Sequence, residues 1–453
     1  MPMDRPAAFR VLAEGLPLQF PASVSAASLY GRAGDRGGAP GPFRGCDPRQ
    51  RIGRVLPNQA VPSILEGELS SMNPAESTLL NLIRHALRQS RYTEDGVADW
   101  SAVFGEAMAQ TVLALAADRL PETVPKEDRA EWNRRSNAQL ASYIRYLYAQ
   151  DEICGLFASS GIPMAILKGS AAAVYYPQPS LRAMGDIDLI VPEDRFSQAE
   201  DLMQRSGYTV LRRDKLRHTE FEKDGQEFEL HRHFSREIDI ERYITDGLQH
   251  LEQGNLEGHV FPMLPKLANG LILLDHMRHH IKTGVGLRQL IDWMMYVELE
   301  LDDAFWESDF QAAAKEKDLD ALAITATRTC QMFLGLSEHI SWCSGANETL
   351  CRQLMETLLS SGNFGRKKGS GSWVEAVAIN IQQRGFFQNL QMVGKANWKT
   401  LKRFPWLSPF AWLYQIFRYC RQMLRTGRLS RTFGDFRRSR EKRSMMKELH
   451  IDQ

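Results

Sequence analysis

The chain lacks several features that would place it in a specialised class. No apolar run reaches the ~18 residues that a membrane-spanning helix needs, so we expect no transmembrane helix. The first residues show no basic stretch followed by an apolar core, and we therefore expect no secretory signal. The six cysteines are scattered without CxxC spacing, which argues against a disulfide framework or a cysteine zinc site. Reduced thiols and a cytoplasmic location are the simplest expectation.

The composition is that of an ordinary globular protein with an uneven charge distribution. The 453 residues are 43% hydrophobic and 25% charged, enough for two or three domains. The net charge of +1 conceals a basic tail, because residues 366–453 hold 19 Lys and Arg against 5 Asp and Glu, a balance of +14 that leaves −13 for the rest. An anionic partner, self-association and docking of the tail on the acidic body all suit this pattern.

Periodicity divides the chain into five regions. Residues 1–60 contain eight Gly and eight Pro without sustained periodicity, which predicts a disordered segment. Residues 73–160 have helical spacing and predict a helical subdomain. A compact core is expected over 161–240, helices over 241–360, and a basic amphipathic region over 361–453, entered through a glycine-rich linker at residues 362–373.

Two aspartates lie at the beginning of a short predicted strand, one just before it and one within it. The strand Ile187–Val191 is rich in β-formers and is ended by Pro192. Because side chains alternate along a strand, Asp186 and Asp188 point to the same face. Two carboxylates so placed suit Mg²⁺, which binds one or two carboxylates together with substrate phosphates. Taken alone, the motif is better explained as a strand edge with two solvated aspartates.

A second motif precedes this strand. Met164–Leu167 reads as a short strand that enters Lys168, Gly169 and Ser170, and a helix rich in alanine follows. A joint of this kind presents free backbone N–H groups to a phosphate. The alternative is an ordinary tight turn with a small-residue helix packed on a sheet. The two motifs in this order are stronger evidence than either one alone.

These residues carry a resemblance to a known family. The segments LKGS, YYPQPSLRAMGDIDLIVP and FELH resemble a bacterial family of nucleotidyltransferases in the polymerase-beta-like superfamily, whose acceptors are largely unknown. The resemblance covers about Leu167–His233 and extends weakly to about Glu298. Fifteen residues separate Ser170 from Asp186, a spacer that the narrower family shares. The resemblance implies an α+β fold, a small mixed-sheet nucleotidyltransferase core within a mostly helical chain.

The resemblance also implies the metal ligands. Asp186 and Asp188 would bind two Mg²⁺ ions, with Mn²⁺ as the alternative, and Glu229 of the FELH motif would be the third ligand and would help to activate the acceptor hydroxyl. Strand alternation places Glu229 and His231 on one face. The family usually has an aromatic residue where this chain has Arg232, which weakens inferences about the acceptor.

The nucleotide-binding residues follow from the same comparison. Gly169 and Ser170 would hold the β- and γ-phosphates, Lys168 and Arg182 would supply positive charge, and His231 would bind phosphate or orient Glu229. For Lys168 and Arg182 a structural ion pair explains the residue equally well. For His231 an outlying histidine without a direct role is the alternative.

Other polar residues are better explained by packing. His276 and His280 lie one helical turn apart, but no third ligand has matching spacing, so we expect them to pack beside the core. The helix that follows has a strong apolar face, from which Arg288 or Asp292 would reach the cleft.

The basic tail contains an amphipathic helix. Its apolar face includes Leu413, Ile416 and Phe417, and arginines such as Arg418 and Arg421 flank that face. Docking on the acidic body is the simplest interpretation, and an anionic membrane surface is the second. The same charge also suits nucleic acid.

We therefore predict a Mg²⁺-dependent enzyme that moves a nucleoside monophosphate from a nucleoside triphosphate to an unknown acceptor and releases pyrophosphate. The first alternative is a scaffold protein with weak turnover, which binds nucleotide at a membrane assembly. The second is a toxin-like enzyme that modifies a protein or transfer RNA. The expected location is the cytoplasm, with peripheral attachment to the inner membrane face as an extension of the second tail interpretation.

Overall fold

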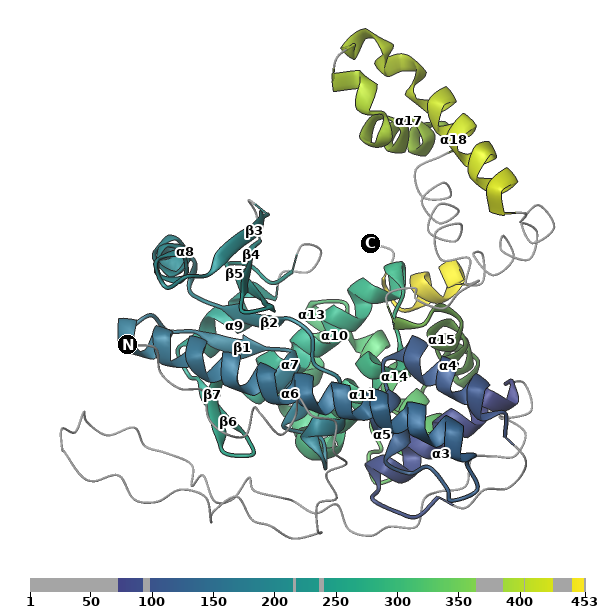
Figure 1. Ribbon diagram of the computed structural model, residues 1–453. Helices are drawn as coiled ribbons and strands as arrows, with labels where there is room; N and C mark the ends of the chain where they lie inside the picture. Colours follow the sequence, from purple (N-terminus) through teal and green to yellow (C-terminus); the bar gives the residue numbers. More distant parts are fainter. Residues whose placement is uncertain are drawn as a thin grey trace. The chain divides into compact units, whose positions relative to one another are not determined.

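The computed structural model describes residues 72–92, 98–214, 217–235, 240–363, 386–402, 404–426 and 442–451. Figure 1 shows the helices and strands of these segments. The predicted disordered segment at residues 1–60 lies outside the described residues, as does most of the predicted linker, residues 364–373.

The helices before the sheet match the helical periodicity of the sequence. They are α3 (Pro74–Leu87), α4 (Trp100–Gln110), α5 (Leu113–Ala117) and α6 (Lys126–Ser160). Asn73 and Glu76 form a reciprocal capping box that begins α3. The chain turns at Thr111, where φ is 58°, and this separates α4 from α5.

The described residues form a seven-stranded mixed sheet. Its strands are β1 (Ala165–Leu167), β2 (Ile187–Ile190), β3 (Thr209–Arg213), β4 (His218–Lys223), β5 (Gln226–His231), β6 (Glu252–Leu256) and β7 (His259–Met263). Their order is β3-β4-β5-β2-β1-β7-β6, in which β2 pairs with β5 and β1 with β7 in parallel, while the other pairs are antiparallel. This mixed sheet among many helices confirms the predicted α+β class.

Two hairpins build the outer parts of the sheet. Asp224 and Gly225, a residue pair typical of hairpin turns, join β4 to β5, and both have positive φ, 52° and 79°. The sequence did not anticipate the hairpin of β6 and β7, which turns at Glu257 and Gly258. The sheet therefore continues beyond residue 240, into the region where we expected helices.

Helices pack against the sheet and around one another (Figure 1). The elements between and after the strands are α7 (Gly169–Ala173), η3 (Pro179–Leu181), η4 (Glu193–Arg195), α8 (Phe196–Arg205), α9 (Glu241–Leu248), α10 (Lys266–Thr283), α11 (Leu287–Glu300), α12 (Asp303–Phe305), η5 (Trp306–Phe310), α13 (Gln311–Glu316), α14 (Asp320–Leu334) and α15 (Glu348–Ser361). Ten of the fourteen residues of α11 are buried, and its Trp293 donates to Thr327 of α14 over 2.9 Å. The apolar face predicted for this helix is therefore confirmed as core.

The C-terminal residues return to the helical core. Residues 442–448 are helical, and the side chains of Met445, Met446, Leu449 and Ile451 are fully buried in the main hydrophobic cluster. Met445 lies against Thr357 of α15, with 3.7 Å between Sδ and Oγ1. This last part of the basic region thus packs on the helical core. Docking of the amphipathic helix that contains Leu413 and Phe417 stays a prediction.

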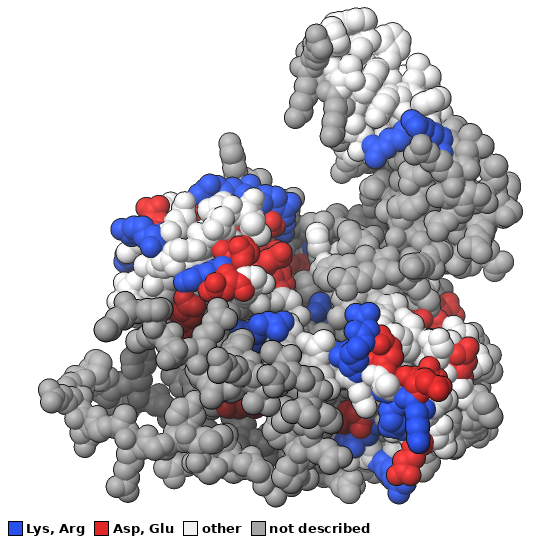
Figure 2. All heavy atoms as spheres, viewed as in Figure 1, with Lys and Arg blue, Asp and Glu red and all other residues white. Residues whose placement is uncertain are grey.

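A separate helical hairpin precedes that segment. It consists of α17 (Phe386–Asn397), η7 (Lys399–Lys402), η8 (Pro405–Phe410) and α18 (Ala411–Thr426). The two helices approach closely, because a Cβ on Gly394 would lie 2.0 Å from the carbonyl oxygen of Ala411. Trp398 stacks on Tyr414 with ring centroids 5.0 Å apart. In Figure 2 the visible face of this hairpin is largely uncharged, with basic and no acidic side chains among its described residues.

Among the described residues, no helix combines the length and the apolar character needed to cross a membrane.

Candidate active site

The joint between β1 and α7 is tightly constrained. A Cβ on Gly169 would lie 2.3 Å from the hydroxyl oxygen of Tyr146, a buried residue of α6, so only glycine fits beneath that ring. Lys168 has φ 46° and ψ −113°, a backbone conformation that side chains rarely adopt and that tends to collect at functional sites. Gly169 and Ser170 are buried, while the Lys168 side chain is 15% exposed. Lys168 is thus the residue of this turn that reaches the surface of the site.

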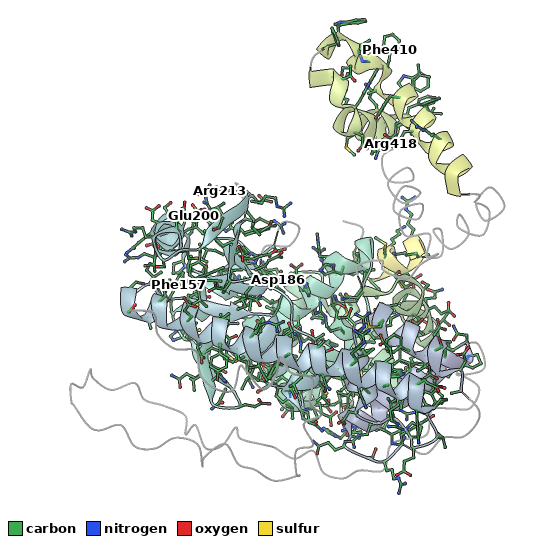
Figure 3. The ribbon with its side chains drawn as sticks, in the orientation of Figure 1. Phe157, Asp186, Glu200, Arg213, Phe410 and Arg418 are labelled. Atoms are coloured by element: carbon green, nitrogen blue, oxygen red, sulfur yellow. The ribbon has the colours of Figure 1, made fainter. Side chains whose placement is uncertain are left out.

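Neighbouring parallel strands bring the three predicted carboxylates together. In the register of β2 and β5, Asp188 lies directly opposite Glu229, and Asp186 comes immediately before β2, where Figure 3 labels it. One carboxylate oxygen from each residue lies within 4.8 Å of the others. Asp188 is buried, Glu229 is partly buried and Asp186 is the most exposed of the three. The cluster is therefore enclosed by protein at Asp188 and open to solvent at Asp186.

Two basic side chains offset the charge of this cluster. Lys168 Nζ lies 2.6 Å from Asp188 Oδ1, and His231 Nε2 lies 3.0 Å from the same oxygen and 3.3 Å from Glu229 Oε2. Burial alone would lower the pKa of Lys168, but the carboxylates, Asp188 first, raise it instead. The pKa of His231 is raised in the same way, against burial, by hydrogen bonds to Asp188 and Glu229.

The carboxylates still repel one another. The charge of Asp188, together with burial, raises the pKa of Asp186 to about 6. Burial opposes ionisation of Glu229, but the hydrogen bond from His231 and the charge of Lys168 hold its pKa well below the usual value. Three oxygen ligands with this excess of negative charge fit a hard divalent cation, which would relieve the repulsion. The residues present therefore fit Mg²⁺ or Mn²⁺.

Arg182 makes a buried ion pair. Its Nε and Nη2 donate to the two oxygens of Asp292 on α11, each over 2.7 Å, and Tyr176 donates to the same carboxylate over 2.8 Å. The side chains of Arg182 and Asp292 are 5% and 6% exposed. On the same helix, Arg288 donates to the carbonyl oxygen of Ala183 over 3.1 Å. The loop before the aspartates is thus held on α11, and phosphate binding by Arg182 stays a prediction.

The paired histidines of α10 contact each other. His276 and His280 have their Nε2 atoms 3.0 Å apart, and burial lowers both pKa values, that of His280 to about 3. Neither belongs to a group of three potential metal ligands in the described part of the chain. This arrangement agrees with the expected packing role.

Sequence reasoning missed one residue near the site. His218 of β4 lies directly opposite His231 of β5, and its ring centroid is 5.1 Å from that of His231. The signal was present in the chain. The two-residue turn at Asp224 and Gly225 fixes the register of the hairpin, and counting back from it pairs His218 with His231.

Comparison with known proteins identifies the family. A family model described as uncharacterised nucleotidyltransferase matches residues 96–335, more than half of the 453-residue chain. No curated protein matches the chain. The matched range contains the whole sheet, the three clustered carboxylates and the helices α10 and α11. The chain belongs to this uncharacterised nucleotidyltransferase family.

Proposed function

We propose that the chain is a metal-dependent nucleotidyltransferase that moves a nucleoside monophosphate from a nucleoside triphosphate to an acceptor and releases pyrophosphate. The observation that carries this proposal is the gathering of Asp186, Asp188 and Glu229, whose carboxylate oxygens lie within 4.8 Å of one another. Membership of the family supports nucleotidyl transfer in general. Mg²⁺ on these three residues would neutralise triphosphate charge and polarise the α-phosphoryl group.

Glu229 and His231 have different roles beside the acceptor, one as proton acceptor and the other as the residue that positions it. The acceptor oxygen forms a bond to the α-phosphorus while the bond from that phosphorus to the pyrophosphate oxygen breaks. The hydroxyl proton of the acceptor would pass to Glu229, whose side chain is partly exposed, whereas that of Asp188 is buried. His231, with Nε2 3.3 Å from Glu229 Oε2, holds that carboxylate in place.

Lys168 would serve the phosphates. Its ammonium is 2.6 Å from Asp188, and a cation on the aspartates would compete with it for that oxygen. The lysine charge would then be available to the triphosphate beside the turn of Gly169 and Ser170. The charge of Arg182 is offset by its bidentate ion pair with Asp292, so its part is to hold the loop before the aspartates in place. The acceptor is a hydroxyl or another nucleophile on a protein, peptide, sugar or RNA.

The first test is the binding of each labelled nucleoside triphosphate to the full chain, with and without Mg²⁺. We expect Mg²⁺-dependent binding to wild type and a large loss in Asp186→Asn/Asp188→Asn. Asp194→Asn/Asp201→Asn is a control with the same charge change at two exposed positions, and it should bind as wild type does. Absence of binding to folded wild type would overturn the proposal.

A second candidate function, attachment to a membrane surface, is supported by the helical hairpin. The hairpin of α17, η8 and α18 exposes large apolar side chains, among them Trp406 at 71%, Phe417 at 69% and Phe387 at 63%. Residues 386–426 hold seven Lys and Arg and no Asp or Glu. Exposed aromatic residues with uniformly positive charge favour an anionic membrane surface. Attachment there suits the enzyme as well as a scaffold with weak turnover, which measured turnover would separate.

A further inference from the structure

The hairpin of β4 and β5 carries six potential metal ligands on one face, and four of them form two neighbouring cross-strand pairs at one end. His218 pairs directly with His231, and Glu220 pairs directly with Glu229 two residues further along. Because side chains alternate along a strand, all four point to the same side of the sheet. Cross-strand neighbours of this kind are close enough to share an ion.

Distances single out three of the four. One ring nitrogen of His218, one of His231 and one carboxylate oxygen of Glu229 lie within 4.8 Å of one another. Glu220 lies 3.3 Å from His218 Nε2, but it forms an ion pair with Arg212. His231 Nε2 also lies 3.0 Å from Asp188, so this group adjoins the aspartates.

Both histidines are buried and incompletely bonded. His218 is 4% exposed and His231 is 3% exposed. The Nδ1 atoms of both rings are buried and have no hydrogen-bond partner among the described residues. Buried polar atoms are normally paired, so an unpaired ring nitrogen in each of these two adjoining histidines is an independent indication of a missing ligand.

We propose that His218, His231 and Glu229 form a binding site for a transition-metal dication, with Zn²⁺ as the best fit. Two imidazoles and one carboxylate are a donor set that suits Zn²⁺, and Mg²⁺ prefers oxygen ligands alone. This site goes beyond the nucleotidyltransferase function and does not require it. Glu229 belongs to both ligand sets, so Zn²⁺ here withdraws Glu229 from Asp186 and Asp188. Competition with Mg²⁺-dependent nucleotide binding follows, and only this consequence rests on the proposed function.

The test measures Zn²⁺ binding to the full chain in excess Mg²⁺, by calorimetry and by metal analysis after dialysis. We expect one Zn²⁺ per chain in wild type and in Asp186→Asn/Asp188→Asn, and a loss of affinity of at least about tenfold in His218→Gln. His250→Gln, at an exposed histidine, is the matched control. If Asp186→Asn/Asp188→Asn also lost Zn²⁺ binding, the ion would be bound at the proposed Mg²⁺ site alone. If His280→Gln lost Zn²⁺ binding instead, the ion would lie on α10. Either result would overturn the proposal, as would no binding to wild type.

Co²⁺ supplies a second measurement that needs no loss of function. Wild type should give the visible bands of bound Co²⁺, and His218→Cys should add a thiolate-to-Co²⁺ charge-transfer band, which only direct ligation produces. An unchanged spectrum in folded His218→Cys would contradict the site. Triphosphate binding is read separately. Zn²⁺ should weaken triphosphate binding to wild type and leave triphosphate binding to His218→Gln unchanged. If no triphosphate binds at all, the Zn²⁺ assay still tests the metal site by itself.

Discussion

At the scale of single residues, the ion pairs of Lys168 and Arg182 distinguish two residues that look alike in the sequence. Lys168 and Arg182 had the same two interpretations in the sequence, phosphate binding or a structural ion pair. Arg182 has both carboxylate oxygens of Asp292 as partners and is almost fully buried. Lys168 pairs with a carboxylate that a metal would occupy, and it keeps an exposed portion. The sequence could not separate the two residues, because Asp292 lies 110 residues from Arg182 along the chain.

The pair of Arg182 and Asp292 gives a prediction for stability. Removing one partner leaves the other charge buried, which costs about 3–5 kcal/mol. We therefore expect Arg182→Met and Asp292→Leu each to lower the free energy of unfolding by several kcal/mol, and the double variant to lose much less than the sum. Urea unfolding measures all three. Additive losses would contradict the coupling. Arg195→Met, at an exposed arginine of η4, should change little.

At the scale of elements, the strands that carry the site could be predicted and an outer hairpin could not. β2, β4 and β5 have β-branched or aromatic residues, and Asp224 and Gly225 mark their turn. β6 and β7 contain Gly254 and Pro262, which argue against strands. The structure overrides this because the Phe261 ring covers Gly254, where a Cβ would lie 2.3 Å from the ring. Tertiary packing of this kind leaves no local signal.

The strand-turn-helix element that positions Lys168 gives the next prediction. In Gly169→Ala the new Cβ would meet the hydroxyl of buried Tyr146, so we expect a loss of about 1–3 kcal/mol in the free energy of unfolding. Tyr146→Phe removes the atom at 2.3 Å and leaves the ring carbon at 3.3 Å, so the second substitution should restore part of that loss. Denaturant unfolding of the cycle measures both effects.

A control for this cycle lies on α6. Gly155→Ala places its Cβ in open space within a helix, and it should be neutral or stabilising by about 0.5–1 kcal/mol. If Gly169→Ala unfolded at the same denaturant concentration as wild type, the close approach of Tyr146 would not constrain the turn.

Figure 3 offers a contrast on the surface, where the pair of Glu200 and Arg213 is exposed enough that its removal should change stability little.

At the scale of the whole molecule, the charge asymmetry of the sequence resolves into two different segments. The family match ends at residue 335, before α15 and everything that follows it. Beyond it, Met445, Leu449 and Ile451 are core residues, whereas the hairpin of α17 and α18 exposes aromatic side chains. Amphipathic periodicity alone could not separate these two segments of the tail, because it does not reveal which apolar faces pack against the rest of the chain.

The exposed hairpin gives the last prediction, that the full chain binds vesicles of phosphatidylcholine mixed with phosphatidylglycerol more tightly than vesicles of phosphatidylcholine alone. Trp406→Ser/Phe417→Ser should weaken binding about tenfold or more, because burying each large apolar side chain contributes about 1.5–3 kcal/mol. Arg418→Gln/Arg421→Gln should remove the preference for the anionic lipid and the sensitivity to salt. Co-sedimentation measures each effect. Leu211→Ser/Val260→Ser changes two exposed apolar side chains of β3 and β7 and should leave binding unchanged. Equal binding to both vesicles, or binding to transfer RNA in place of vesicles, would contradict a membrane role, because the same seven basic residues would then serve a nucleic acid.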